Sequence, residues 1–136
     1  MKKPLVVLLL VLGSLLTGTA LGQSKPARRI TLAFAPSVWK SDFADAVDFQ
    51  NQFPMEPLCH GLTLIRSEKA NTADYQLIIG TDAQQQHVWI LGVTKGGKTG
   101  GMGYQKKMGD AVRDVCLTIW DDEHLPYPIH PGGTVE

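Results

Sequence analysis

Residues 92–99 contain the pattern of a phosphate-binding loop. The segment is Gly-Val-Thr-Lys-Gly-Gly-Lys-Thr, which satisfies G-x-x-x-x-G-K-S/T and follows an apolar stretch that is typical of a strand. In such a loop, backbone amides would surround the phosphates, Lys98 would contact their oxygens and Thr99 would bind magnesium. The motif also needs a helix that begins near Lys98, whereas a glycine-rich stretch follows it here. We therefore expect a connecting loop rather than a nucleotide site.

Four lysines accompany the glycine-rich segment 92–103, and they form a second candidate site: Lys95, Lys98, Lys106 and Lys107. A local positive patch of this kind could contact an anion or an anionic partner. A solvated basic loop is the structural alternative. We keep two functional interpretations of this segment, a partner-binding surface at the lysines and, as the alternative, a ligand-binding or enzymatic use of the glycine-rich loop.

Cys59 and Cys116 are the two cysteines of the chain. In an oxidising compartment, an even pair favours a disulfide over two free thiols. The alternative is a pair of small buried hydrophobic side chains. His60 follows Cys59, but neighbours on a strand point to opposite faces, so we do not expect a thiol–imidazole catalytic pair. We predict a Cys59–Cys116 disulfide, which would stabilise the fold by about 4 kcal/mol in the chain-entropy model.

The carboxyl-terminal segment gathers oxygen and imidazole groups that a divalent metal could use. Asp121, Asp122 and Glu123 precede His124, and His130 follows among three prolines. This spacing matches no closed metal site, so we expect a solvated tail with His124 and His130 as the metal-ligand candidates. We predict no catalytic residue and no cofactor.

The amino terminus has the order of a secretory signal peptide. A short basic start precedes an apolar run over residues 5–16, and small residues lead to a cleavage position after Gly22. The apolar run is shorter than the roughly 20 residues of a spanning helix. We predict that residues 1–22 are removed on export and that residues 23–29 are a flexible lead-in; an uncleaved membrane anchor stays open as the alternative.

Length and composition restrict the class of protein. The chain has 136 residues, of which 43% are hydrophobic, so we expect one domain and neither a disordered chain nor a multi-span membrane protein. It has 13 basic and 13 acidic residues, and the signal peptide contains two of the lysines and no acid. The exported chain would therefore have 11 basic and 13 acidic residues, a net charge of −2. That balance makes nucleic acid an unlikely partner.

Hydrophobic periodicity predicts the element order β-α-β-β-β-α. The expected strands are residues 30–34, 60–66, 75–80 and 87–94. The expected helices are one that Ser37 or Ser41 caps, with Trp39, Phe43, Ala46 and Val47 facing inward, and a second over residues 104–120 after a loop at 95–103. We therefore predict an α+β domain over residues 30–120, with two helices on one face of a mixed or mostly antiparallel sheet, and an irregular tail over residues 121–136.

Residues 73–80 resemble a strand of small bacterial envelope domains, of which the amino-terminal domain of TolB is one example. The segment is Ala-Asp-Tyr-Gln-Leu-Ile-Ile-Gly, and the expected element order over residues 30–120 is similar as well. The resemblance implies an α+β envelope domain that works through protein contacts. We expect a small exported, non-enzymatic binding or accessory module of the cell envelope, periplasmic or extracellular, whose partner is another envelope protein.

Overall fold

The computed structural model describes residues 29–130 and 132–136, and the signal peptide predicted at residues 1–22 lies outside this part of the chain, as does nearly all of the predicted lead-in. The strands are β1 (Ile30–Phe34), β2 (Leu62–Leu64), β3 (Tyr75–Asp82), β4 (His87–Thr94), β5 (Thr99–Gln105) and β6 (Thr134–Val135). The helices are α2 (Val38–Ser41), α3 (Phe43–Gln52) and α4 (Met108–Asp122), with 3-10 helices η1 (Phe53–Met55), η2 (Pro57–Cys59) and η3 (Ser67–Thr72). None of these helices is long and apolar enough to cross a membrane.

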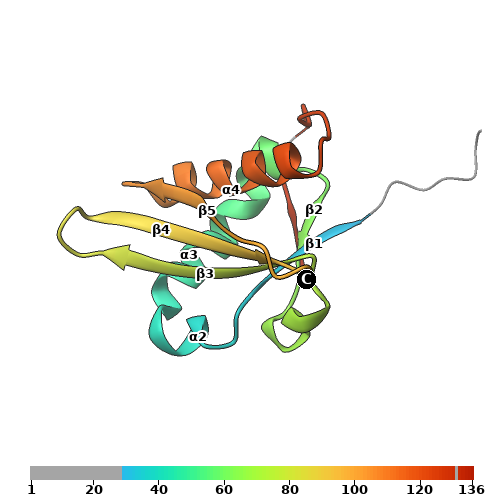
Figure 1. The fold of residues 1–136 in the computed structure, drawn as a ribbon. Coiled ribbons are helices and arrows are strands. Elements are labelled where there is room, and N and C mark those ends of the chain that lie inside the picture. The colour runs from blue at the N-terminus through green and yellow to red at the C-terminus, as the bar shows by residue number, and fades with distance from the viewer. Residues whose placement is uncertain (1–28, 131) are drawn as a thin grey trace, which may run out of the picture.

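The strands form one sheet in the order β5-β4-β3-β1-β2-β6 (Figure 1). β1 runs parallel to both β2 and β3, and β2 runs parallel to β6. β3, β4 and β5 form an antiparallel meander. The sheet is therefore mixed, and the predicted α+β class is confirmed.

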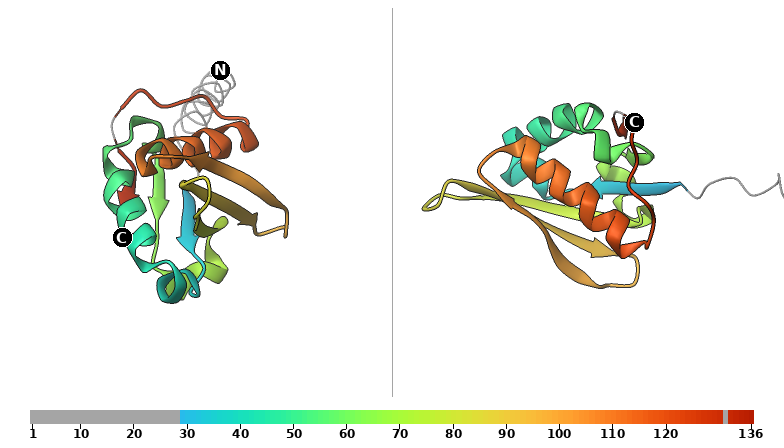
Figure 2. Two further views of the ribbon diagram at one scale, coloured as in Figure 1. Left: turned by 90° about the vertical axis from the view of Figure 1, so that its left-hand side faces the viewer. Right: turned by 90° about the horizontal axis from the view of Figure 1, so that it is seen from above.

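The helices α3 and α4 contact each other and pack on one face of the sheet, as predicted (Figure 2). Alternate strand residues point into the core beneath them, and Leu32, Leu77 and Ile90 are completely buried there. On the opposite face, η3 covers a small apolar cluster that includes Ala33 and Ile65. η3 also contacts β3, whereas no helix of the described residues covers β5 on that face.

The helix predicted after residue 37 is interrupted at Asp42, whose φ of −135° and ψ of 43° are not helical. This break separates α2 from α3 and changes which side chains of α3 face the sheet. Phe43 is 61% exposed, so its predicted inward orientation is wrong. Phe49 is buried instead, with its ring centroid 5.1 Å from that of Phe34 in an edge-to-face contact.

Residues 99–105 form β5, so the predicted loop over residues 95–103 and the predicted helix start at Tyr104 are wrong. The strand pairs with β4 through backbone hydrogen bonds, which do not depend on side chains. A bulge in this ladder leaves Met102 as an extra residue, and its side chain enters the core. Since glycine has a low strand propensity, the composition of β5 hid it from the sequence-based prediction.

The tail predicted to be irregular over residues 121–136 returns to the sheet as β6, so that prediction is wrong at its end. The Gly133 amide donates to the Phe53 carbonyl at 3.0 Å just before the strand begins. A Cβ atom at position 133 would overlap the Phe53 ring, so glycine permits this close approach. The domain therefore extends beyond the predicted boundary at residue 120.

Cys59 and Cys116 form the predicted disulfide, with Cα atoms 5.2 Å apart. The bond joins η2, which directly precedes β2, to the middle of α4. It spans 57 positions of the sequence, and both cysteines are completely buried. The bridge thus ties the middle of α4, which packs on β5 and β4, to the segment that precedes β2.

We predict that Cys59→Ala/Cys116→Ala lowers the free energy of unfolding by about 2–5 kcal/mol, because the unfolded chain regains the freedom that the closed loop removes. Urea unfolding measures the loss. The wild-type protein unfolded in the presence of dithiothreitol is the matched comparison, and it should show a similar loss. Equal stability of the oxidised wild type and the double variant would contradict the prediction.

Candidate functional site

The residues of the phosphate-loop pattern form the turn of a hairpin. The Thr94 amide donates to the Lys98 carbonyl at 3.0 Å, and the Gly97 amide donates to the Thr94 carbonyl at 2.9 Å. The Lys98 amide donates to the Thr94 hydroxyl at 3.1 Å. These amides therefore bond within the turn, and the chain continues as β5 rather than as a helix. The geometry that a phosphate-binding loop requires is not formed.

The four candidate lysines are separated into two groups. The Lys95 ammonium lies 3.6 Å from Asp74 Oδ1, and the Lys98 ammonium lies 3.3 Å from Asp122 Oδ1, both at the start of β5. Lys106 and Lys107 are exposed and follow the end of β5. Because β5 has 7 residues, the two groups are about 20 Å apart. They therefore flank the strand and do not form a single patch.

Tyr75 joins the sheet to the end of α4 beside Lys98. It is 2% exposed, and its hydroxyl donates to Asp122 Oδ2 at 2.7 Å and to Glu123 Oε1 at 3.1 Å. Burial raises the pKa of the Tyr75 phenol well above its usual value, and the two carboxylates raise it further. The Tyr75 hydrogen bond, followed by that of Lys98, lowers the pKa of Asp122. This group is a neutral tyrosine held by carboxylates, which suits a structural connection rather than proton transfer.

The outer side of β5 is an open strand edge (Figure 2). Thr99, Gly100 and Gly101 are exposed there, and the Met102 carbonyl accepts a hydrogen bond from the Thr118 hydroxyl at 3.5 Å. Neither Gly100 nor Gly101 has a positive φ, and a Cβ atom at either position would meet no atom within 4 Å. The fold itself therefore does not require glycine at these two positions.

Aromatic side chains lie on the uncovered sheet face next to this edge. The His87 and Tyr104 rings stack with centroids 4.5 Å apart, and Tyr104 is 50% exposed. The Trp89 ring lies over Gly80, where a Cβ atom would overlap it. The open edge of β5 is thus continuous with a half-exposed aromatic surface.

The remaining sequence candidates are not brought together. The disulfide engages Cys59, and the His60 ring packs against His130 with centroids 5.4 Å apart. His124 lies at the end of α4 with a φ of 54°. Within residues 29–130 and 132–136, no three His, Cys, Asp or Glu side chains are close enough to hold a metal ion.

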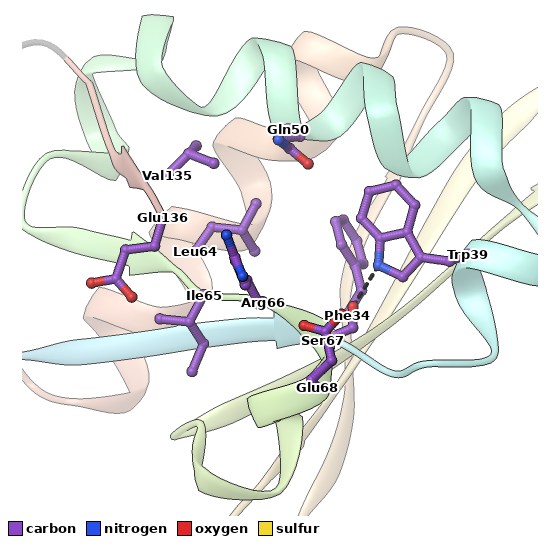
Figure 3. A pocket seen from close by; sticks show the side chains of 10 residues that line it. All are labelled: Phe34, Trp39, Gln50, Leu64, Ile65, Arg66, Ser67, Glu68, Val135 and Glu136. Carbon is purple, nitrogen blue, oxygen red and sulfur yellow. Dashed lines mark hydrogen bonds between the residues drawn. The ribbon is translucent and has the colours of Figure 1, made fainter.

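A cleft of about 350 Å³, which the sequence did not predict, opens at the carboxyl ends of β1, β2 and β6 (Figure 3). Its lining combines aromatic, apolar and charged side chains from α2, α3, η3 and these strands: Phe34, Trp39, Gln50, Leu64, Ile65, Arg66, Ser67, Glu68, Val135 and Glu136. The prediction of an irregular tail hid this cleft, because Val135 of β6 and the following residue, Glu136, line it. Ligands of α/β sheets bind beyond the carboxyl ends of the strands. A sequence-based prediction that β1, β2 and β6 are parallel would therefore have indicated the cleft.

Comparison of the chain with protein-family models, with curated proteins and with solved structures gives no significant match. The resemblance of residues 73–80 to the amino-terminal domain of TolB stays a prediction.

We predict that Tyr75→Phe lowers the free energy of unfolding by about 1–2 kcal/mol at neutral pH, because the carboxylates of Asp122 and Glu123 lose the hydroxyl of a buried tyrosine as their donor. The folded pKa of Tyr75 is raised, so the unfolded state releases its proton first, and the contribution of Tyr75 to stability decreases as the pH rises above about 10. The difference between wild type and variant should therefore shrink toward about pH 11. Urea unfolding over this pH range measures it.

Tyr104→Phe is the control for alkaline unfolding, since Tyr104 is an exposed phenol that bonds to Asp82 at 3.1 Å. This variant should retain most of the wild-type decrease in stability at high pH. If Tyr75→Phe and wild type lose stability in parallel across the alkaline range, Tyr75 does not form the proposed connection.

Proposed function

We propose that the chain is a small exported, non-enzymatic binding module of the bacterial cell envelope, and that it takes up an extended segment of another envelope protein as an additional strand beside β5. The observation that carries this proposal is the open, glycine-rich edge of β5 with lysines at both of its ends. The order of residues in the predicted signal peptide supports export, and so does the buried disulfide, because disulfides persist in oxidising compartments.

Open strand edges are usually protected in folded proteins. Natural sheets place charged side chains or proline on an edge, or cover it, because its unpaired amides and carbonyls attract other strands. The exposed start of β5 is Thr99-Gly100-Gly101, which contains neither charge nor proline. Strand addition is a common way of recognising extended peptides, and it uses such backbone groups for affinity.

The two exposed glycines support the same conclusion. Glycine weakens a strand interior because it loses more backbone freedom on folding and has no side chain to pack. Gly100 and Gly101 weaken β5 in this way, although a side chain at either position would meet no atom of the domain within 4 Å of its Cβ. A partner strand that approaches closely would give both positions a use.

The charges beside β5 favour an acidic segment over a second copy of this chain. In an antiparallel pair of two β5 strands, Lys98 of one copy would lie near Lys106 and Lys107 of the other, and like charges directly opposite are destabilising. An extended segment with Asp or Glu beside the end of β5 would instead meet Lys106 and Lys107, which form no ion pair among the described residues. We therefore propose an acidic extended segment as the partner.

A photo-crosslinking residue placed at position 101 tests the proposal in intact cells. It should yield an adduct with another envelope protein. Position 48, an exposed site in α3 on the other face of the sheet, is the control position and should yield little. An adduct of the size of two copies of this chain, or equal labelling from both positions, would contradict the proposal.

We predict that Lys106→Glu/Lys107→Glu reduces this cross-linking several-fold, because two attractive charges become repulsive. Lys40→Glu/Lys69→Glu changes the net charge equally at exposed positions away from β5 and should leave the adduct unchanged. An equal reduction in both variants would indicate a general effect of charge rather than contact at the end of β5.

We predict that Gly101→Val leaves the domain as stable as wild type or more stable by up to about 1 kcal/mol, because valine favours a strand and its Cβ meets open space. The same change should weaken partner capture by obstructing close approach. Gly103→Val should instead destabilise the domain, since a Cβ there lies 3.1 Å from the Ala111 carbonyl oxygen. Urea unfolding and cross-linking from position 99, done together, separate these effects. Undiminished capture by Gly101→Val would contradict close approach at that residue.

A further inference from the structure

The cleft beyond β1, β2 and β6 lies where the chain changes direction across the sheet. From β1 the chain crosses to β2 through α2 and α3 on one face, and from β2 it passes through η3 on the other face to β3 on the far side of β1. Two neighbouring connections that leave on opposite faces separate at the strand ends and open a crevice. In open sheets with parallel strands, ligands bind in this kind of crevice.

One wall of the cleft is a fixed aromatic surface. Trp39 lies edge-to-face against the buried Phe34, with ring centroids 5.9 Å apart. The Trp39 indole N–H donates to the Ser67 hydroxyl, drawn as the dashed line in Figure 3, so the ring is held from both sides. A rigid, half-buried indole gives a flat apolar group a surface without a large loss of side-chain entropy.

Arg66 supplies a positive charge to the same space. Figure 3 shows its side chain rising along Leu64 into the cleft, with Gln50 above it and Trp39 across from it. Within the part of the chain that the structure describes, no carboxylate forms an ion pair with Arg66. Its guanidinium therefore offers the planar donor geometry that matches a carboxylate, and the Gln50 amide adds a neutral donor on the neighbouring wall.

The acidic side chains of the cleft restrict the charge of a ligand. Glu68 lines the cleft near Ser67, and Glu136 lines it next to Val135. The Glu136 carboxylate accepts a hydrogen bond from Arg29, whereas Glu68 has no such partner among the described residues. A second negative charge on a ligand would be repelled by Glu68, so the cleft favours a single negative charge over two.

We propose that this cleft binds a small organic monocarboxylate with a flat apolar group. The carboxylate would bond to Arg66, and the apolar group would lie against Trp39. The cleft volume of about 350 Å³ is at the lower end of the range for small-molecule sites, which suits a ligand of one ring and a short side chain. This proposal is independent of strand addition at β5.

Titration of the isotope-labelled protein, followed by NMR, tests it with defined probes. Phenylacetate should shift the Trp39 indole N–H and Arg66 Nε–H signals in a saturable manner. Acetate lacks the apolar group and benzyl alcohol lacks the charge, so each should bind at least several-fold more weakly. Phenyl phosphate, with its second charge, should also bind more weakly than phenylacetate.

Arg66→Gln should weaken phenylacetate binding at least about tenfold, because the charge-assisted pair is lost. Arg66→Lys should restore part of the affinity, since it keeps the charge without the planar donors. Arg113→Gln removes an equal charge from an exposed position on α4 outside the cleft and should bind like wild type. Cross-peaks elsewhere in each spectrum show that the variants are folded.

Three results would overturn the proposal. The first is the absence of saturable shifts at Trp39 and Arg66 with phenylacetate at millimolar concentration. The second is tighter binding of phenyl phosphate than of phenylacetate, which would contradict the assignment of a single charge. The third is equal affinity in Arg66→Gln and wild type, which would remove the proposed anchor.

Discussion

The parallel pairing of β1 with both β2 and β3 is the constraint on which the rest of the fold depends. Parallel neighbours cannot be joined by tight turns, so each connection must cross the sheet. Here α2 and α3 make one crossing and η3 makes the other, on the opposite face. This arrangement covers both faces of β1 and leaves the meander β3-β4-β5 on one side of it. The cleft and the open edge both result from this division.

The position of α4 depends on two further connections. The Cys59–Cys116 bond fixes its middle to the segment before β2, and the Tyr75 hydroxyl fixes its end to β3 through Asp122. These points lie on opposite sides of β1 in the sheet order. Together they tie α4, which packs on β5 and β4, to the segment before β2 as well, so one helix links the antiparallel and the parallel parts of the sheet.

Apolar side chains at alternate positions were sufficient to predict β1, β3 and β4, because every second residue of each strand points into the core beneath α3 and α4. The Cys59–Cys116 disulfide was predicted from the even number of cysteines and from the oxidising compartment that the predicted signal peptide implies. The errors occur where backbone contacts outweigh side-chain pattern. β5 is paired through glycine backbone, β6 is a two-residue strand that depends on tertiary pairing with β2, and Asp42 interrupts a helix whose periodicity continues through it. The candidate lysines could be identified, but their separation by β5 could not, since the strand itself was missed.

The open edge and the cleft are structurally separate. β4 and β3 lie between β5 and β1, and the cleft lies at the carboxyl ends of β1, β2 and β6. A strand added at β5 would extend the sheet at one border, whereas a ligand in the cleft would contact α2, α3 and η3 at the other. Energetic coupling between them would have to pass through β3 and β1, which are held in the sheet by backbone pairing and by the core residues Leu32 and Leu77. The two proposed sites are therefore expected to act independently, so a variant at one should leave binding at the other unchanged.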